Sequence, residues 1–405
     1  MRVPTLLVLV WLTAIACIDP IDQTLSQHVN VVVVEGSITN LTEPQLIYLN
    51  RSKSDSITGR FGTLPLTGAT VKVYVDSSQV ITYQETLPGR YQSPAGFTGQ
   101  VGHTYQLRLT LKDGTYYQSS PEVMPSVPAV QKIYQNFNST SLSSGLLNND
   151  FYRAANDVYI DWQDPIDEHN YYRWDWRLWE RQVWCKTCTS GWYIIYDLDD
   201  QNLVEDCFAA LPGQGAGYFI NDYSCRNNCW AVIRNYDTKV FDDRFSNGSL
   251  IKNHRIAQIP YYQVNGCLVE IRQSSLTLKA YQYDKMVQEQ TQNTGGIADT
   301  PPTALIGNIT NVTNLQERVV GYFRASAVSA PRLWISRQEN TGNPPGLYHA
   351  LNSRLPSSED AEYDPNTGVV KPKPQLFSKL YSRPPTAPCL EGDNSTPTKP
   401  IGWRD

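Results

Sequence analysis

Short runs that alternate apolar and polar residues recur from residue 31 to about residue 120, with turn-forming residues between them. Between Tyr105 and Leu111 every second side chain is apolar, which is the period of a strand with one buried face. Asp113-Gly114 follows as a hairpin turn signal. The pattern predicts an all-β sandwich over residues 31–120. The expected strands are Val31–Ile38, Gln45–Leu49, Ala69–Val75, Val80–Glu85, Arg90–Ser93, Tyr105–Leu111 and Thr115–Ser119.

Residues 131–340 are also rich in β-prone runs, but one stretch has the spacing of a helix. Ser274 and Ser275 can cap its start, and Gly295-Gly296 can end it. Its apolar stripe consists of Leu276, Ala280, Tyr283 and Val287. We therefore predict a second, β-rich domain with at least one helix, near residues 275–293, packed on a sheet.

Proline-bearing segments divide the chain. The stretch Pro121–Pro128 indicates a linker, over residues 121–130, between the two β-rich regions. Residues 341–405 are rich in Pro, Ser, Asn and Gly and mostly lack periodicity. We expect them to form a Pro-rich C-terminal extension wrapped on the second domain.

The N-terminus has the pattern of a bacterial lipoprotein signal. Arg2 supplies a positive charge, Val3–Ile15 forms an apolar run, and small residues precede Cys17. We predict a signal peptide over residues 1–16, acylation of Cys17 with fatty acids such as palmitate, and a lipid-anchored tether over residues 17–30. An ordinary secretory signal with a chance cysteine is the alternative. The apolar run is shorter than the roughly 20 residues of a transmembrane helix.

Composition describes the rest of the chain as water-soluble and extracytoplasmic. With 405 residues the chain is too long for one ordinary domain and predicts about two or three. Charged residues make up 18% and the net charge is -5, whereas a nucleic-acid-binding protein would carry a basic face. We therefore expect no nucleic-acid partner.

Cysteine spacing is the strongest chemical signal beyond the N-terminus. The clustered cysteines are Cys185, Cys188, Cys207, Cys225, Cys229 and Cys267, with Cys389 far away. The spacing of Cys185 to Cys188 and of Cys225 to Cys229 could also clamp zinc. In an oxidising compartment disulfides are the stronger expectation, and their connectivity cannot be derived from the sequence. With Cys17 lipidated an odd number remains, so one thiol is free or paired between molecules.

The aromatic stretch Tyr171–Glu180 is the best candidate for a ligand surface. Read as a strand, it places Tyr172, Trp174, Trp176 and Leu178 on one face, which we expect to be core. The opposite face could bind a peptide or glycan, because aromatic rings offer rigid area and arginine is a bidentate donor. This candidate platform consists of Tyr171, Arg173, Arg177 and Trp179.

Catalytic and metal-binding patterns are lacking in the sequence. The histidines, His28, His103, His169, His254 and His349, are scattered, and no hydrolase, zinc-protease or phosphate-loop motif occurs. The acidic residues Asp197, Asp199 and Asp200 lack the glycine and terminal glutamate of an EF-hand loop. We predict no catalytic residue, no metal site and no cofactor.

A series of short motifs occurs in a fixed order along the chain. In order, they are Cys17-Ile18-Asp19-Pro20, Val34-Glu35-Gly36, Gly68-Ala69-Thr70-Val71, Cys229-Trp230, Tyr281 to Tyr283, Gly295-Gly296-Ile297, Pro301-Pro302, Gly307-Asn308-Ile309 and Gly321-Tyr322-Phe323. With these motifs the chain resembles a family of Bacteroidota outer-membrane lipoproteins, catalogued as domain-of-unknown-function family 4249. The resemblance covers about residues 17–340, Cys389 and the closing Gly402-Trp403, while residues 340–385, Cys185 and Cys188 depart from the family pattern.

The resemblance implies an outer-membrane lipoprotein at the cell surface or the periplasmic face, often encoded beside a TonB-dependent receptor. It also implies an immunoglobulin-like first domain, and it supplies no catalytic residues. We therefore expect a non-catalytic accessory of a TonB-dependent β-barrel receptor, acting in substrate capture, capping or complex assembly. The alternative is a structural or adhesive surface lipoprotein that works without a transporter, and an enzyme is the third possibility.

Overall fold

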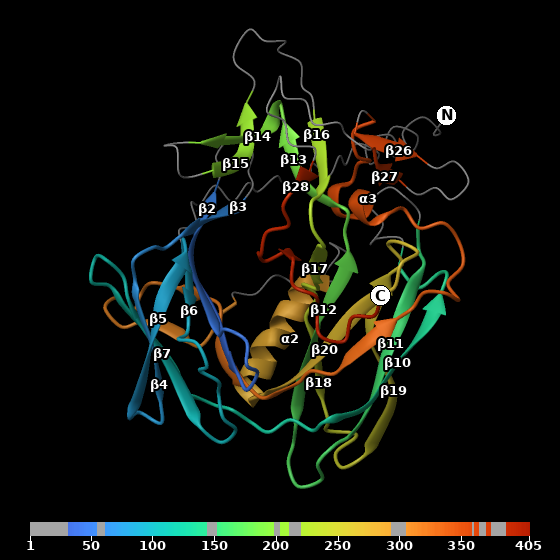
Figure 1. Cartoon of the computed structure of the whole chain (residues 1–405). Coiled ribbons are helices and arrows are strands. Elements are labelled where there is room, and N and C mark those ends of the chain that lie inside the picture. The colour runs from blue at the N-terminus through green and yellow to red at the C-terminus, as the bar shows by residue number, and fades with distance from the viewer. Residues whose placement is uncertain are drawn as a thin grey trace, which may run out of the picture.

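The computed structural model describes residues 31–54, 61–143, 152–197, 203–209, 220–292, 305–358, 360–363, 370–373 and 386–405. Cys17, with the predicted signal peptide and tether, lies outside these residues. The described chain is mainly β, in several sheets, with the helices α2 (Leu278–Gln292) and α3 (Leu347–Asn352) (Figure 1). No helix in this part of the chain has the length and apolar character needed to cross a membrane. The mainly β fold expected from the sequence is confirmed.

The N-terminal strands belong to a twelve-stranded sheet that curls into a nearly closed barrel, at the left of Figure 1. Its strands are β1 (Val32–Thr39), β2 (Leu46–Ser54), β3 (Phe61–Pro65), β4 (Thr70–Val75), β5 (Gln79–Leu87), β6 (Arg90–Gln92), β7 (Thr104–Thr110), β8 (Tyr116–Ser119), β9 (Glu122–Val123), β21 (Ile309–Asn311), β22 (Val319–Val320) and β23 (Phe323–Ser326). The main path runs β21-β8-β7-β4-β5-β6-β2-β1-β22, and its two end strands lie next to each other. Alternating side chains fill the interior, such as Val71 and Val73 of β4 and Leu107 and Leu109 of β7.

Strand β5 lets one sheet bend around this core. Its first half pairs with β4 and its second half pairs with β6, with a register shift between Glu85 and Leu87. Because β6 pairs with β2 as well, the strands form one continuous sheet, and an immunoglobulin-like sandwich is not confirmed. All strands expected between residues 31 and 120 are present, but β3 and β9 were not expected, and three further strands come from residues 309–326. The domain boundaries drawn from the sequence stay a prediction.

The second half of the chain forms a sandwich of two sheets. A three-stranded sheet contains β10 (Val130–Asn138), β11 (Ala155–Gln163) and β19 (Leu250–Pro260). It packs on a seven-stranded sheet of β12 (Tyr171–Arg181), β17 (Trp230–Arg234), β18 (Lys239–Asp242), β20 (Cys267–Leu276), β24 (Val328–Ser329), β25 (Arg332–Ile335) and β29 (Ser395–Thr396). Trp162 of β11 and Trp174 of β12 lie in the core between them, with ring centroids 5.4 Å apart.

Helix α2 covers the other face of the seven-stranded sheet, between that sheet and the barrel (Figure 1). Tyr281 stacks on Tyr171 of β12 at 4.7 Å, and Tyr283 packs against Tyr322 at 5.1 Å. The helix expected near residues 275–293 therefore exists, but its start differs from the prediction. Ser274 and Ser275 belong to β20, and the side chain of Thr277 instead accepts a hydrogen bond from the Ala280 amide.

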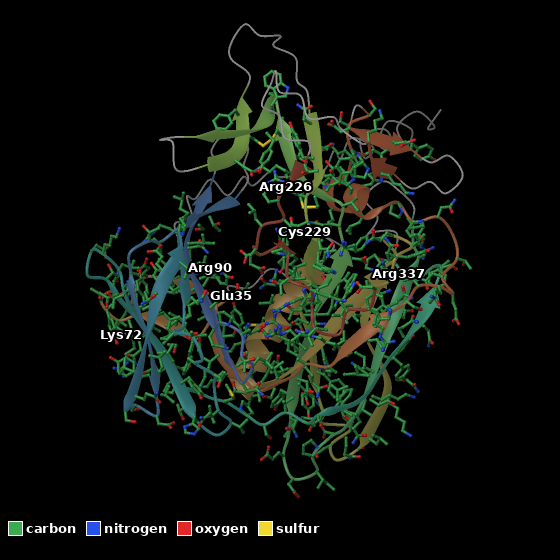
Figure 2. The ribbon with its side chains drawn as sticks, in the orientation of Figure 1. Glu35, Lys72, Arg90, Arg226, Cys229 and Arg337 are labelled. Atoms are coloured by element: carbon green, nitrogen blue, oxygen red, sulfur yellow. A yellow bond between two sulfur atoms is a disulfide. The ribbon has the colours of Figure 1, made fainter. Side chains whose placement is uncertain are left out.

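Small sheets form the upper part of the molecule in Figure 1, and the disulfide between Cys188 and Cys207 links two of them. They contain β13 (Trp184–Thr189), β14 (Gly191–Asp197), β15 (Leu203–Ala209), β16 (Ile220–Cys225), β26 (Ala361–Tyr363), β27 (Val370–Pro372) and β28 (Thr386–Ala387). The C-terminal segment is tied into the structure, because β28 pairs with β16 and β29 pairs with β17. Figure 2 shows Cys229 where these small sheets meet the larger sheet below.

Candidate functional site

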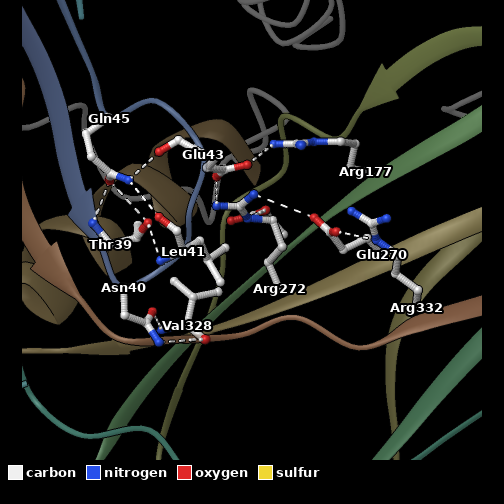
Figure 3. Close-up of polar contacts among 11 residues, drawn as sticks. Thr39, Asn40, Leu41, Glu43, Gln45, Arg177, Glu270, Arg272, Val328 and Arg332 are labelled. Atoms are coloured by element: carbon white, nitrogen blue, oxygen red, sulfur yellow. Dashed lines mark hydrogen bonds and ion pairs between the residues drawn. The ribbon is translucent and has the colours of Figure 1, made fainter. Parts of the chain in front are cut away.

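The loop between β1 and β2 carries Glu43 from the barrel onto the seven-stranded sheet (Figure 3). Its carboxylate accepts a hydrogen bond from Arg177 at 3.0 Å and another from Arg272. Within the loop, the side-chain oxygen of Gln45 accepts a hydrogen bond from the Thr39 amide at 2.7 Å, which fixes the loop conformation. The barrel and the sandwich are therefore joined by charged groups.

A cleft with a volume of about 550 Å³ lies between the barrel, helix α2 and the seven-stranded sheet. The antiparallel register places Arg177 of β12 opposite Arg234 of β17. It also places Asp175 of β12 opposite Arg272 of β20. Because paired residues face the same side of a sheet, these side chains enter the cleft together. The arginines in the described lining are Arg173, Arg177, Arg234, Arg272 and Arg324.

These arginines outnumber the carboxylates that pair with them. Asp284 of α2 forms ion pairs with two of them, with Arg173 at 3.3 Å and with Arg324 at 2.7 Å. Within the described residues Arg234 has no ion pair. Burial lowers the pKa of Arg234, and the neighbouring charge of Arg177 lowers it further. Five carboxylates, Glu35, Glu43, Asp175, Glu270 and Asp284, lie at or beside the cleft, so Arg234 is the arginine of the described lining that no carboxylate pairs with.

Buried guanidinium groups in the cleft also have unused hydrogen-bond donors. Nε of Arg173, Nε of Arg324 and Nη1 of Arg272 have no hydrogen-bond acceptor among the described residues. Each buried donor left unpaired costs about 1–3 kcal/mol. Guanidinium groups bind carboxylate and phosphate oxygens in a planar, bidentate way. The cleft is thus suited to a ligand that presents anionic or hydroxyl oxygens.

Tyr236 adds an exposed aromatic ring at the rim. Its side chain is 91% exposed, and it lies on the short loop between β17 and β18. Together with Arg234 it also lines a second cavity, of about 580 Å³, beside helix α3. An exposed ring next to arginines can stack on a sugar or a peptide side chain.

The four platform residues expected from the sequence lie in different surroundings. Arg173 and Arg177 line the cleft. Tyr171 is covered by Tyr281 of α2, and Trp179, which is 6% exposed, packs in a separate apolar cluster. Binding by this face stays a prediction, with Arg173 and Arg177 as its accessible members.

The sequence did not indicate the other cleft arginines, Arg234, Arg272 and Arg324, as candidate binding residues. They lie on strands distant along the chain, and no local pattern marks them. Only the register between those strands brings their side chains together.

The cysteines of the described residues form three disulfides, and one thiol remains. The pairs are Cys185–Cys225, Cys188–Cys207 and Cys229–Cys389. Cys267 had been included among the disulfide candidates and is not bonded, while the distant Cys389 takes a place in a disulfide. Cys267 lies in the sandwich core, and burial raises the pKa of its thiol. A buried, protonated thiol of this kind is unreactive.

Replacing Glu43 with glutamine is expected to destabilise the protein by about 1–2 kcal/mol at neutral pH, since two charge-assisted hydrogen bonds weaken. Burial would raise the pKa of Glu43, but the hydrogen bonds and charges of Arg272 and Arg177 prevail, so the pKa lies below 4.5. A lowered pKa stabilises the fold above the unfolded-state pKa, and this stabilisation is lost as the pH falls through the folded-state pKa. The difference between wild type and Glu43→Gln should therefore shrink towards pH 3.

Urea unfolding of both proteins at pH 7 and pH 3 measures this difference. Glu339→Gln, which removes an exposed carboxylate, is the control and should change stability little at either pH. An equal difference at both pH values for Glu43→Gln would contradict the assigned ion pairs.

Comparison with known proteins gives a family for most of the chain. The family model described as Domain of unknown function (DUF4249) matches residues 18–332. No curated protein and no solved structure matches the chain. The matched segment includes the barrel, most of the sandwich and helix α2, and it contains every arginine of the described cleft lining. The chain therefore belongs to the DUF4249 family.

Proposed function

We propose that this protein is a non-catalytic outer-membrane lipoprotein that captures a ligand for a TonB-dependent β-barrel transporter. The observation that best supports this is the arginine-lined cleft, whose guanidinium groups offer many hydrogen-bond donors. Such a lining favours binding of a peptide or glycan that presents anionic or hydroxyl oxygens. Capping the transporter or assembling its complex are compatible roles.

The anchor belongs to the same proposal. In this proposal Cys17 carries the lipid and residues 17–30 act as the tether. The barrel, like an immunoglobulin-like domain, separates the second domain from the membrane, at the cell surface or the periplasmic face. The Cys17→Ala variant is then expected to leave the outer membrane, because acyl chains supply about 0.8 kcal/mol per buried CH₂ group. Membrane fractionation with immunoblotting measures this, and retention equal to wild type would contradict the lipid anchor.

Co-purification tests the partner. The full-length, tagged protein is extracted from the outer membrane in mild detergent, and the proteins that remain bound are identified. We expect a TonB-dependent β-barrel receptor among them, and we expect deletion of the gene to abolish uptake of one nutrient class while extracellular hydrolysis continues. Recovery without any barrel receptor would favour the structural or adhesive alternative. Turnover of a glycan, peptide or ester by the purified protein would refute a non-catalytic role.

A pair of matched variants links uptake to the cleft. Arg234→Gln removes a charge that has no ion pair in the described structure and weakens one hydrogen bond, to the main-chain carbonyl of Asp393, so the fold should be retained. Arg318→Gln removes an exposed charge outside the cleft. We expect the first variant to reproduce the uptake defect while still co-purifying with the receptor, and the second to behave as wild type. Normal uptake with Arg234→Gln would remove the cleft from the proposed function.

A further inference from the structure

One end of β12 brings together side chains that lie far apart in the sequence. His169 precedes β12, whereas Asp242 ends β18 and Asp243 follows it. The antiparallel pairing of Tyr171 with Asp242 fixes this arrangement. Nε2 of His169 lies 2.7 Å from Oδ1 of Asp242 and 3.2 Å from Oδ1 of Asp243. All three atoms lie within 4.8 Å of one another.

Asp243 has an unused acceptor that faces this group. Its side chain is fully buried, and Oδ2 accepts a hydrogen bond from the Asn170 amide at 2.8 Å. Oδ1, in contrast, has no hydrogen-bond partner among the described residues. Nε2 of His169 makes an ion-pair contact with Oδ1, but its hydrogen bond is with Asp242.

A third carboxyl group lies beside the site. Asp164, which directly follows β11, is 1% exposed and lies within hydrogen-bonding reach of the Asp243 carboxylate. Its own oxygens accept hydrogen bonds from the Tyr172 hydroxyl at 2.6 Å and the Gly248 amide at 3.1 Å.

The available positive charge is small. Arg244 bonds to Oδ2 of Asp242, and its side chain is 51% exposed. Beyond His169, it is the cation paired with these carboxylates in the described structure. Buried carboxylates are normally paired or coordinate a metal. A divalent cation at Oδ1 of Asp243 would balance the charge and use the acceptor.

We infer that His169, Asp242 and Asp243 bind a divalent transition-metal ion, with zinc as the preferred ion. One imidazole nitrogen with two carboxylate oxygens suits zinc, whereas calcium prefers ligands that are all oxygen. His169 is 47% exposed, so the site opens to solvent and leaves a position for water. The ion joins the loop before β12 to the loop after β18. The inference does not depend on the proposed function.

Titration of the purified, full-length, oxidised protein tests this site. After treatment with a chelator, the protein is titrated separately with zinc, manganese, calcium and magnesium in a calorimeter. We expect one zinc ion per chain, bound more tightly than manganese, and no calcium binding at the same concentrations. His169→Gln and Asp243→Asn are each expected to weaken zinc binding more than about 100-fold. Cobalt should give a visible absorption band that His169→Gln abolishes.

A matched control comes from a second His–Asp pair. His103 and Asp76 lie 2.5 Å apart on the barrel, where both side chains are more than 40% exposed. His103→Gln should leave zinc affinity unchanged, and circular dichroism should show that all variants fold. Three results would overturn the inference: no zinc binding by wild type, equal affinity in wild type and Asp243→Asn, or a preference for calcium.

Discussion

Replacing Arg337 with methionine is expected to lower the free energy of unfolding by about 3–5 kcal/mol. The side chains of Arg337 and Glu180 are both fully buried, and two hydrogen bonds join them, at 2.6 and 3.0 Å. Arg337 also donates to the main-chain carbonyls of Pro260, Gln263 and Asn265. Its removal leaves a carboxylate and these carbonyls without their partner in the protein interior.

The pH dependence of the destabilisation tests whether the unpaired carboxylate of Glu180 causes it. Burial raises the pKa of Glu180 above its ordinary value, against the opposing charge of Arg337. Without Arg337 the pKa should rise further. A raised carboxyl pKa means that the folded state is favoured at low pH and loses stability as the pH rises through that pKa. The destabilisation by Arg337→Met should therefore be smaller at pH 5 than at pH 8.

Denaturant unfolding at both pH values, with circular dichroism as the signal, measures the effect. The double variant Glu180→Gln with Arg337→Met should be more stable than Arg337→Met alone, because the unpaired charge is gone. Arg318→Met, at an exposed position, should change stability by no more than about 0.5 kcal/mol. A double variant less stable than the single one would show that the carbonyl contacts, rather than Glu180, determine the loss.

Local patterns predicted the strands of the first region well. From Tyr105 to Leu111 the alternation of side chains specifies both the strand and its buried face, as β7 shows. The same kind of signal could not place β21, β22 and β23, because each is at most four residues long and joins the barrel from the far end of the chain. Ser274 and Ser275 misled the prediction of the helix start, since a serine before an apolar stripe resembles a cap even where a strand continues.

The candidate site depends on pairing between distant strands. The aromatic stretch marked Arg173 and Arg177, but Arg234 faces Arg177 only because β17 pairs with β12 in one register. His169 and Asp242, likewise, are 73 residues apart, so no spacing motif could indicate a metal site. Among the cysteines, Cys267 was expected to form a disulfide because it lies close to the others in sequence, whereas the fold pairs Cys229 with the distant Cys389. The sequence thus indicated which side chains could bind a ligand or form a disulfide more reliably than it indicated which of them lie close together in the fold.

Removing the disulfide between Cys229 and Cys389, by serine at both positions, is expected to cost about 5 kcal/mol in the chain-entropy description. The two cysteines are 160 residues apart, so the bond restricts the unfolded chain strongly. In the folded state it holds the C-terminal segment, in which β29 pairs with β17 and Trp403 packs on Trp230 at 5.8 Å. Loss of the bond should therefore also expose this segment to proteases.

The disulfide between Cys188 and Cys207 supplies the matched comparison. It spans 19 residues and lies inside the loop closed by Cys185 and Cys225, so its removal should cost no more than about 3 kcal/mol. Urea unfolding under non-reducing conditions measures both variants, and limited proteolysis followed by mass spectrometry reports release of residues 390–405. Because the two variants lose the same kind of bond, their difference isolates loop length and C-terminal docking. An equal or larger loss from the shorter loop would mean that the C-terminal segment stays docked without its covalent link.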